Sequence, residues 1–171
     1  MDWIKLVENI KGFAKSYDLD IIESNSTFIG GQVTTYLLIE NNSVYYEIKH
    51  SKPITEYGSK ICIYSEVKGE ITIKSKSRFF KEPSIKIIGE IPNNIQEHIS
   101  ELASIIGSFS WSIESDKYGW PLQLRVVERL KFECSLMNIS VSQLDRIRLI
   151  HMEIVNHISN KSITNSTNKS F

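Results

Sequence analysis

The chain has 171 residues, of which 41% are hydrophobic and 23% are charged, and its 20 basic residues equal its 20 acidic residues. A chain of this length can bury about 70% of its unfolded surface without a metal or disulfide staple, and the composition is that of an ordinary globular domain. Because the charges balance, no global field attracts nucleic acid or an anionic membrane, and we expect neither as a partner.

The N-terminal residues and the cysteines indicate the compartment. Segment 1–17 has an acid at position 2 and charges throughout, unlike a secretory signal, and no apolar run reaches the ~18 residues that a membrane span needs. Cys62 and Cys134 are too few and too far apart in sequence for a disulfide framework. We therefore expect a cytoplasmic protein. The abundance of Ile, Lys, Asn and Ser is typical of an AT-rich bacterial genome.

The first half of the chain predicts one helix followed by strands. Apolar residues recur near the N-terminus at three- and four-residue spacing, which predicts a helix, and Asp2 is placed to cap it. From residue 19 to residue 89, short β-branched and aromatic runs alternate with turn residues such as Asn41 and Asn42. These runs predict about six strands, which are antiparallel because the connections are too short for crossovers.

The second half predicts helix, strands and helix. Residues 91–107 show helical spacing, with Asn93 or Asn94 near the start and Gly107 at the end. Residues 109–113 and 122–126 alternate as the two partners of a hairpin, and the alternation continues to residue 137. Ser140 and Gln143 form the capping box of a last helix.

Together these elements predict a single α+β domain over residues 1–158, followed by a flexible polar tail over 159–171. The domain comprises an N-terminal helix, an antiparallel meander of about six strands, a helix, a β-hairpin and a C-terminal helix, with the helices packed on one face of the sheet. This order resembles that of the small α/β chaperones that hold type III secretion effectors. The resemblance is one of topology and involves no motif, and the near-neutral charge departs from the usual acidity of those chaperones.

No motif for catalysis, a cofactor or a metal is recognisable. The histidines at positions 50, 98, 151 and 157 lack metal-ligand spacing, and there is no nucleophile elbow or phosphate loop. Each cysteine is expected on the strand face that its apolar neighbours share, as a small buried hydrophobe. We therefore predict no catalytic residue, no metal and no cofactor.

Glu128 is the one carboxylate that the strand alternation directs toward the core. One interpretation is a buried general acid or base with a raised pKa. The other is a β-bulge or strand end that returns Glu128 to solvent and also accounts for the outward Val127. We favour the second interpretation because a single local irregularity explains both residues.

Basic residues mark another stretch, where Lys74, Lys76 and Arg78 share one face of a possible edge strand. They could contact an anion such as a nucleic-acid phosphate, or they could protect a sheet edge against aggregation. We favour edge protection because phosphate binding generally needs a broad basic surface, which this chain lacks.

The turn between the hairpin strands is the strongest candidate contact surface. Gly119 and Pro121 account for the turn, but the turn requires neither Tyr118 nor Trp120. The two rings either fold back onto the sheet or form an aromatic tip for a partner, since Tyr, Trp and Arg are enriched in interface hot spots. Two nearby arginines that we expect to point outward, Arg125 and Arg129, would extend that surface.

These observations lead to two functional hypotheses. The first is a non-enzymatic protein-binding domain of inhibitor, immunity, adaptor or chaperone-like type, whose partner is another protein. The alternative is a small-molecule-binding domain or an unrecognised enzyme that uses a tyrosine-rich sheet face. The tyrosines of that face would be Tyr36, Tyr45, Tyr46 and Tyr64.

Overall fold

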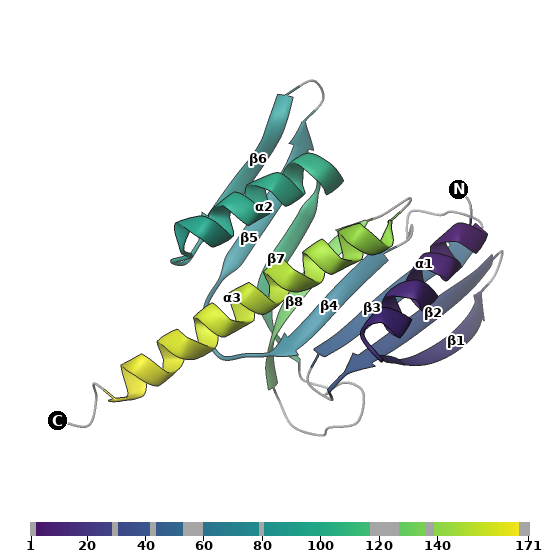
Figure 1. Ribbon diagram of the computed structural model, residues 1–171, viewed down its shortest axis with the longest axis horizontal. Helices are drawn as coiled ribbons and strands as arrows, with labels where there is room; N and C mark the ends of the chain where they lie inside the picture. Colours follow the sequence, from purple (N-terminus) through teal and green to yellow (C-terminus); the bar gives the residue numbers. More distant parts are fainter. Residues whose placement is uncertain are drawn as a thin grey trace.

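The computed structural model describes residues 3–28, 31–41, 44–52, 60–78, 81–116, 127–135 and 139–167. Within these ranges the chain forms three helices and one antiparallel sheet of eight strands (Figure 1), which confirms the predicted α+β class. The elements in chain order are α1 Trp3–Ser16, β1 Asp20–Phe28, β2 Gly31–Glu40, β3 Val44–Lys52, β4 Lys60–Glu66, β5 Thr72–Arg78, β6 Lys81–Ile88, α2 Asn93–Ile106, β7 Phe109–Asp116, β8 Val127–Ser135 and α3 Val141–Thr167.

The strand order across the sheet is β1-β2-β3-β4-β8-β7-β5-β6. The first four strands form a meander, as predicted, and β8 then pairs with β4 on one side and with β7 on the other. Phe132 at the centre of β8 stands opposite Ile63 of β4 and Trp111 of β7. The last strand therefore joins the two parts of the sheet.

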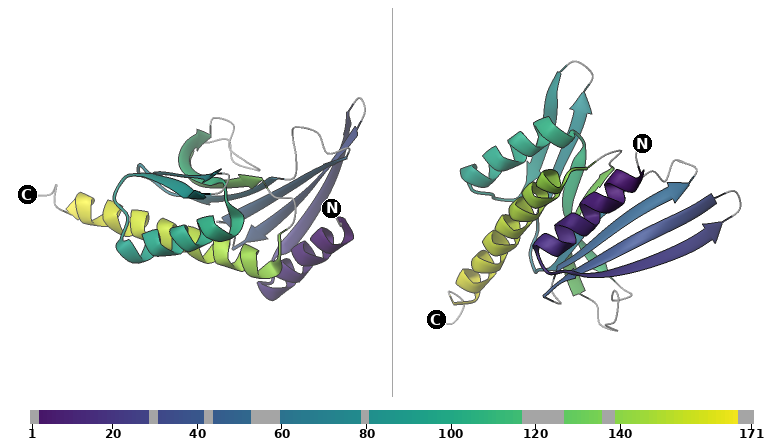
Figure 2. Two further views of the ribbon diagram at one scale, coloured as in Figure 1. Left: turned by 90° about the horizontal axis from the view of Figure 1, so that it is seen from above. Right: turned by 45° about the vertical axis from the view of Figure 1, so that its right-hand side comes forward.

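All three helices lie on one face of the sheet (Figure 2). Helix α3 lies between the other two and contacts both α1 and α2. The core fills the space between the sheet and this helical layer, and an aromatic cluster marks its centre, with the ring centroids of Trp111 and Phe132 4.6 Å apart. The largest fully buried side chains include Trp111, Tyr46, Phe13, Phe132 and Ile10.

Local signals set several element boundaries as predicted. The capping box before α3 is present, because Ser140 N donates to Gln143 Oε1 at 2.9 Å and Gln143 N donates to Ser140 Oγ at 3.2 Å. Gly107 ends α2 with a positive φ of 77°, and Asn41 follows β2 with φ of 51°. The start of α2 also agrees with the prediction, because the helix begins at Asn93; its N-cap residue is Pro92, without a side-chain cap.

Two predicted boundaries differ from the structure. The strand that pairs with β7 is Val127–Ser135 rather than residues 122–126, which lie outside the described residues. The alternating pattern runs through 122–126 and through β8, so it does not show which of the two segments pairs with β7. In the structure Leu130, Phe132 and Cys134 of β8 are buried opposite β7. Helix α3 also continues to Thr167, beyond the boundary predicted at residue 158.

Candidate functional site

The predicted aromatic contact surface lies mostly outside the described residues, which include neither Tyr118, Trp120 nor Arg125. Arg129 is described, and the expectation that it points outward to solvent is wrong, because it is only 4% exposed. In the sheet register Glu66 of β4 and Glu114 of β7 stand opposite Arg129 from either side. The sequence could not reveal this burial because it does not show which strands flank β8.

The prediction that the basic stretch forms an edge strand is wrong. Strand β5 lies between β7 and β6, and β6 forms the edge of the sheet. Lys74 and Lys76 are both exposed, while Arg78 ends the strand. The sequence did not indicate that β5 lies inside the sheet, because its second partner, β7, comes only after α2 in the chain.

Glu128 is the second residue of β8 and is exposed to solvent. This placement agrees with the strand-end interpretation rather than with a buried acid. Its backbone carbonyl accepts a hydrogen bond from Val67 N at 3.1 Å, which helps to fix the start of β8.

The four tyrosines do not share one face, so the predicted tyrosine-rich face is wrong. Tyr36 and Tyr46 point into the core beneath the helices and are 4% and 0% exposed. Tyr45 is the neighbour of Tyr46 and therefore points to the opposite face. It stands opposite Tyr64 in the register of β3 and β4. The core positions of Tyr36 and Tyr46 leave only two tyrosines for the face away from the helices.

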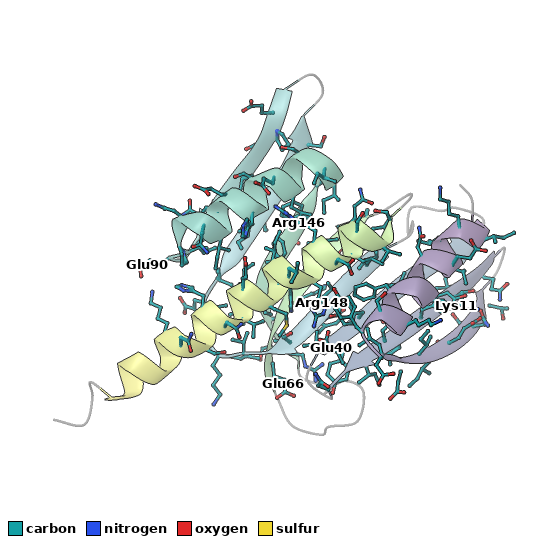
Figure 3. The ribbon with its side chains drawn as sticks, viewed as in Figure 1. Lys11, Glu40, Glu66, Glu90, Arg146 and Arg148 are labelled. Carbon is teal, nitrogen blue, oxygen red and sulfur yellow. The ribbon has the colours of Figure 1, made fainter. Side chains whose placement is uncertain are left out.

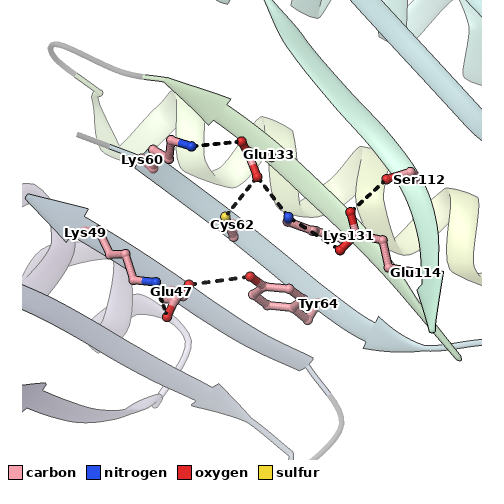
Figure 4. Close-up of polar contacts among 9 residues, drawn as sticks. All are labelled: Glu47, Lys49, Lys60, Cys62, Tyr64, Ser112, Glu114, Lys131 and Glu133. Atoms are coloured by element: carbon pink, nitrogen blue, oxygen red, sulfur yellow. Dashed lines mark hydrogen bonds and ion pairs between the residues drawn. The ribbon is translucent and has the colours of Figure 1, made fainter. Parts of the chain in front are cut away.

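Polar residues gather on the sheet face opposite the helices (Figure 4). We call this surface the charged sheet face. It spans β3, β4, β8 and β7, and no helix of the described part of the chain covers it. The residues that define it are Tyr45, Glu47, Lys49, Lys60, Cys62, Tyr64, Ser112, Glu114, Lys131 and Glu133.

Ion pairs across three strands fix the centre of the charged sheet face. Lys131 Nζ lies 2.9 Å from Glu133 Oε2 and 3.5 Å from Glu114 Oε2, and Lys60 Nζ lies 3.3 Å from Glu133 Oε1. The hydrogen bond from Lys131 lowers the pKa of Glu133. Burial alone would lower the pKa of Lys131, but Glu133 and Glu114 outweigh it and raise that pKa. Glu133 and Lys131 therefore stay ionised near neutral pH.

The same pattern continues to β3. Lys49 Nζ pairs with Glu47 Oε1 at 2.9 Å, and the hydroxyl of Tyr64 donates to Glu47 Oε2 at 3.4 Å. Lys49 and Lys60 stand opposite each other in the register, and each is held by its own glutamate. The residues that define the charged sheet face include lysines and glutamates in equal number, so this face presents both signs of charge.

Cys62 lies on the charged sheet face, so the prediction that it shares the face of Ile61 and Ile63 is wrong. It is nevertheless only 6% exposed, and its Sγ lies 3.9 Å from Glu133 Oε2. Cys134 is on the helical side of the sheet, as predicted. Burial raises the pKa of both thiols. Both cysteines are thus protonated at neutral pH and are poor nucleophiles.

The structure also reveals an ion pair between the buried Glu40 and the partly buried Arg148, which the sequence did not indicate. Arg148 of α3 donates to both carboxylate oxygens of Glu40 at the end of β2, and Tyr46 donates to Glu40 Oε2 at 2.5 Å (Figure 3). The guanidinium also lies 4.2 Å from the ring centroid of Tyr17. Burial would raise the pKa of Glu40, but the bonds from Arg148 and Tyr46 outweigh it and lower that pKa. The strand parity that Glu40 shares with Tyr36 could have indicated its burial.

A second buried polar cluster surrounds His151, which is 0% exposed. Trp111 Nε1 donates to His151 Nδ1 at 3.2 Å, and His151 Nε2 lies 2.9 Å from Ser65 Oγ. Because an indole N–H can only donate, Nδ1 must accept, so the imidazole proton is on Nε2 and is donated to Ser65. Burial lowers the pKa of His151 to about 3. The ring is thus a neutral core residue with both nitrogens engaged.

Among the residues that the structure describes, no group of three His, Cys, Asp or Glu side chains could hold a metal ion. A cavity of about 440 Å³ lies beside the ends of β5 and β6. Its polar side chains include Glu70, Glu128 and Ser115, without a histidine, cysteine or lysine among its lining residues. Ser115 and Glu128 stand opposite each other in the register of β7 and β8 at this cavity.

The chain matches no protein-family model, no curated protein and no solved structure. None of the helices in the described ranges combines the length and the apolar character needed to cross a membrane.

Proposed function

We propose that the chain is a non-enzymatic protein-binding domain, of inhibitor, immunity, adaptor or chaperone-like type, and that the charged sheet face is its contact surface. The observation that carries this proposal is the ordered charge pattern on a sheet face that the described helices leave uncovered. A partner would meet side chains that are already held in place, which reduces the entropy lost on binding.

The chemistry of this face suits a protein partner better than a polyanion. Tyr45 and Tyr64 lie between lysines and glutamates, and interfaces are rich in tyrosine and use complementary charges to select their partner. Because positive and negative groups alternate, the face has no broad basic surface of the kind that nucleic acid requires. A folded protein with alternating charges of its own can match such a pattern.

The polar groups elsewhere support a binding role over catalysis. His151 has both nitrogens engaged, and Glu40 is capped by Arg148 and Tyr46. A general acid or base must be able to exchange its proton with a substrate. These residues instead satisfy one another within the core, where they contribute to the specificity of packing.

The test is affinity capture from a lysate of the organism that encodes the chain, with protein identification by mass spectrometry. Wild type is compared with Lys60→Glu, which reverses a charge on the charged sheet face and removes the ion pair to Glu133. Lys161→Glu on α3 is the matched control, because Lys161 is 48% exposed, against 42% for Lys60, and also forms one ion pair with a glutamate. Circular dichroism and thermal melting establish that all three proteins fold.

We expect one protein to co-purify with wild type and with Lys161→Glu, and to be lost or strongly depleted with Lys60→Glu. The captured protein, made separately, should then form a complex of fixed stoichiometry with wild type in size-exclusion chromatography. Retention of the partner by Lys60→Glu and by a second face variant, Lys49→Glu, would show that the contact lies elsewhere. Failure of wild type to capture any protein would contradict the binding role itself.

A further inference from the structure

The two edges of the sheet differ in how they are protected against pairing with another strand. The edge strand β6 contains Lys81, Pro83 and Lys86, and its pairing with β5 shifts register near Lys76. Lysine, proline and bulges are the usual means by which an edge strand avoids a further partner. The edge strand β1 has none of these features, since it contains no lysine, arginine or proline.

Strand β1 is also long, regular and partly apolar at its surface. Its nine residues pair with β2 in unbroken register from Asp20 to Phe28. Ile21 and Ile22 are 40% and 51% exposed, and they point to opposite faces of the sheet. No described strand pairs with the outer side of β1, which forms the rim of the sheet (Figure 2). An exposed strand of this kind is a template for another strand.

We propose that a second copy of the chain pairs its own β1 with this edge, antiparallel about a two-fold axis at Ser24, so that one sheet continues through both copies. Such an interface is isologous and closes after two copies, because each β1 covers the free edge of the other. The charged sheet face that we propose as a partner surface is centred on β4 and β8 and stays available in this assembly.

The distribution of charge in β1 selects the register. A two-fold axis perpendicular to the sheet pairs residues that point to the same face, so the axis must pass through a residue position. An axis at Glu23 would set two carboxylates directly opposite each other, which is destabilising. An axis at Ser24 pairs all nine residues, with Glu23 opposite Asn25 of the second copy and Ile22 opposite Ser26.

Helix α1 adds charge complementarity to this pairing. Asn9 Nδ2 donates to Ile139 O at 2.8 Å, so this side of α1 faces the start of α3. Lys11 lies on the other side of α1, over the β1 side of the sheet (Figure 3). Glu23 points to the same helical face of the sheet, because it pairs with the inward Tyr36. Lys11 and Glu23 therefore lie on the same side of the sheet near the β1 edge, so each copy presents both signs of charge where the two copies would meet.

The first test is the mass of the purified chain by sedimentation velocity at concentrations from micromolar to hundreds of micromolar. We expect wild type to sediment as a dimer at the upper concentrations, and Ile22→Lys to raise the dissociation constant at least about tenfold, since each copy loses one cross-strand contact and gains a charge. Ile88→Lys is the matched control, because Ile88 is a 55% exposed isoleucine on the other edge strand and should leave the dimer unchanged. A wild type that stays monomeric at every concentration, or a dimer that Ile88→Lys breaks and Ile22→Lys does not, would overturn the proposal.

The second test reports the register. In the proposed assembly the two copies of residue 24 are opposite, so Ser24→Lys and Ser24→Glu should each weaken the dimer, and an equimolar mixture of the two should restore it. Ser24→Cys should form a disulfide-linked dimer under mild oxidation, while Thr27→Cys should not. The native cysteines do not compete, because both are buried. A mixture of Ser24→Lys and Ser24→Glu that stays as dissociated as either variant alone would show that residue 24 is not at the axis.

Discussion

The buried imidazole of His151 makes the stability of the fold depend on pH in a defined window. Its pKa is lowered by burial to about 3, whereas a histidine in an unfolded chain has a pKa of about 6.5. Because the unfolded state binds the proton more readily, the free energy of unfolding falls as the pH falls below about 6.5 and continues to fall toward pH 3. Protonation would also place a proton on Nδ1 of His151, where it would face the N–H of Trp111 and remove the hydrogen bond that Trp111 donates to Nδ1.

The magnitude follows from the width of this window. Each pH unit between the two pKa values changes the free energy of unfolding by about 1.4 kcal/mol, so a shift from pH 7 to pH 5 should cost about 2 kcal/mol. Carboxyl groups whose pKa is lowered, such as Glu40 and Glu133, contribute mainly at lower pH, since their unfolded pKa is near 4.5. Histidine protonation therefore dominates between pH 5 and pH 7.

Urea unfolding at pH 7 and pH 5, followed by tryptophan fluorescence, measures this difference. The variant His151→Gln keeps an amide that can accept from Trp111 and donate to Ser65, but it does not titrate, so its stability should change much less over the same interval. His98→Gln is the matched control, because His98 is about 39% exposed and its replacement should retain the wild-type pH dependence. A wild type as stable at pH 5 as at pH 7, or an equal loss in His151→Gln, would refute the reasoning.

Two further predictions test the other buried groups. Arg148→Met should destabilise the fold by about 3–5 kcal/mol, because it leaves the carboxylate of Glu40 buried without its cation; Arg146→Met, which removes an ion pair at the surface, should cost less than about 1 kcal/mol in the same urea titration. The thiols of Cys62 and Cys134 should react with a thiol-specific reagent only at the rate of unfolding, because both are buried and protonated; fast labelling of either in the folded protein would contradict this placement.

The parts of the fold that depend on local physics could be predicted from the sequence. The capping box of Ser140 and Gln143 and the glycine that ends α2 act over a few residues, so the sequence alone indicates them. Alternation in β7 predicted the buried side of that strand, where Phe109 and Trp111 are 5% and 0% exposed. These signals follow from the periods of helices and strands, which do not depend on what packs against them.

The features that depend on distant strands could not be predicted in this way. Arg129 is buried although it stands between two exposed glutamates, Glu66 of β4 and Glu114 of β7, and these strands are far from one another in sequence. The position of Cys62, by contrast, follows from local alternation, which places it on the face opposite Ile61 and Ile63. The contact surface around Tyr118 and Trp120 stays a prediction, since the described residues do not include it.

Strand β8 links the fold to the proposed function, because it completes the sheet and the charged sheet face at the same time. Without β8, the strands β1–β4 and the strands β5–β7 would each end at an unpaired edge. The ion pairs of Lys131 and Glu133 on β8 reach Glu114 on β7 and Lys60 on β4, so the charge pattern crosses both junctions. A partner that covers this surface would therefore bind only the completed sheet, and its binding would stabilise the long-range pairings on which that sheet depends.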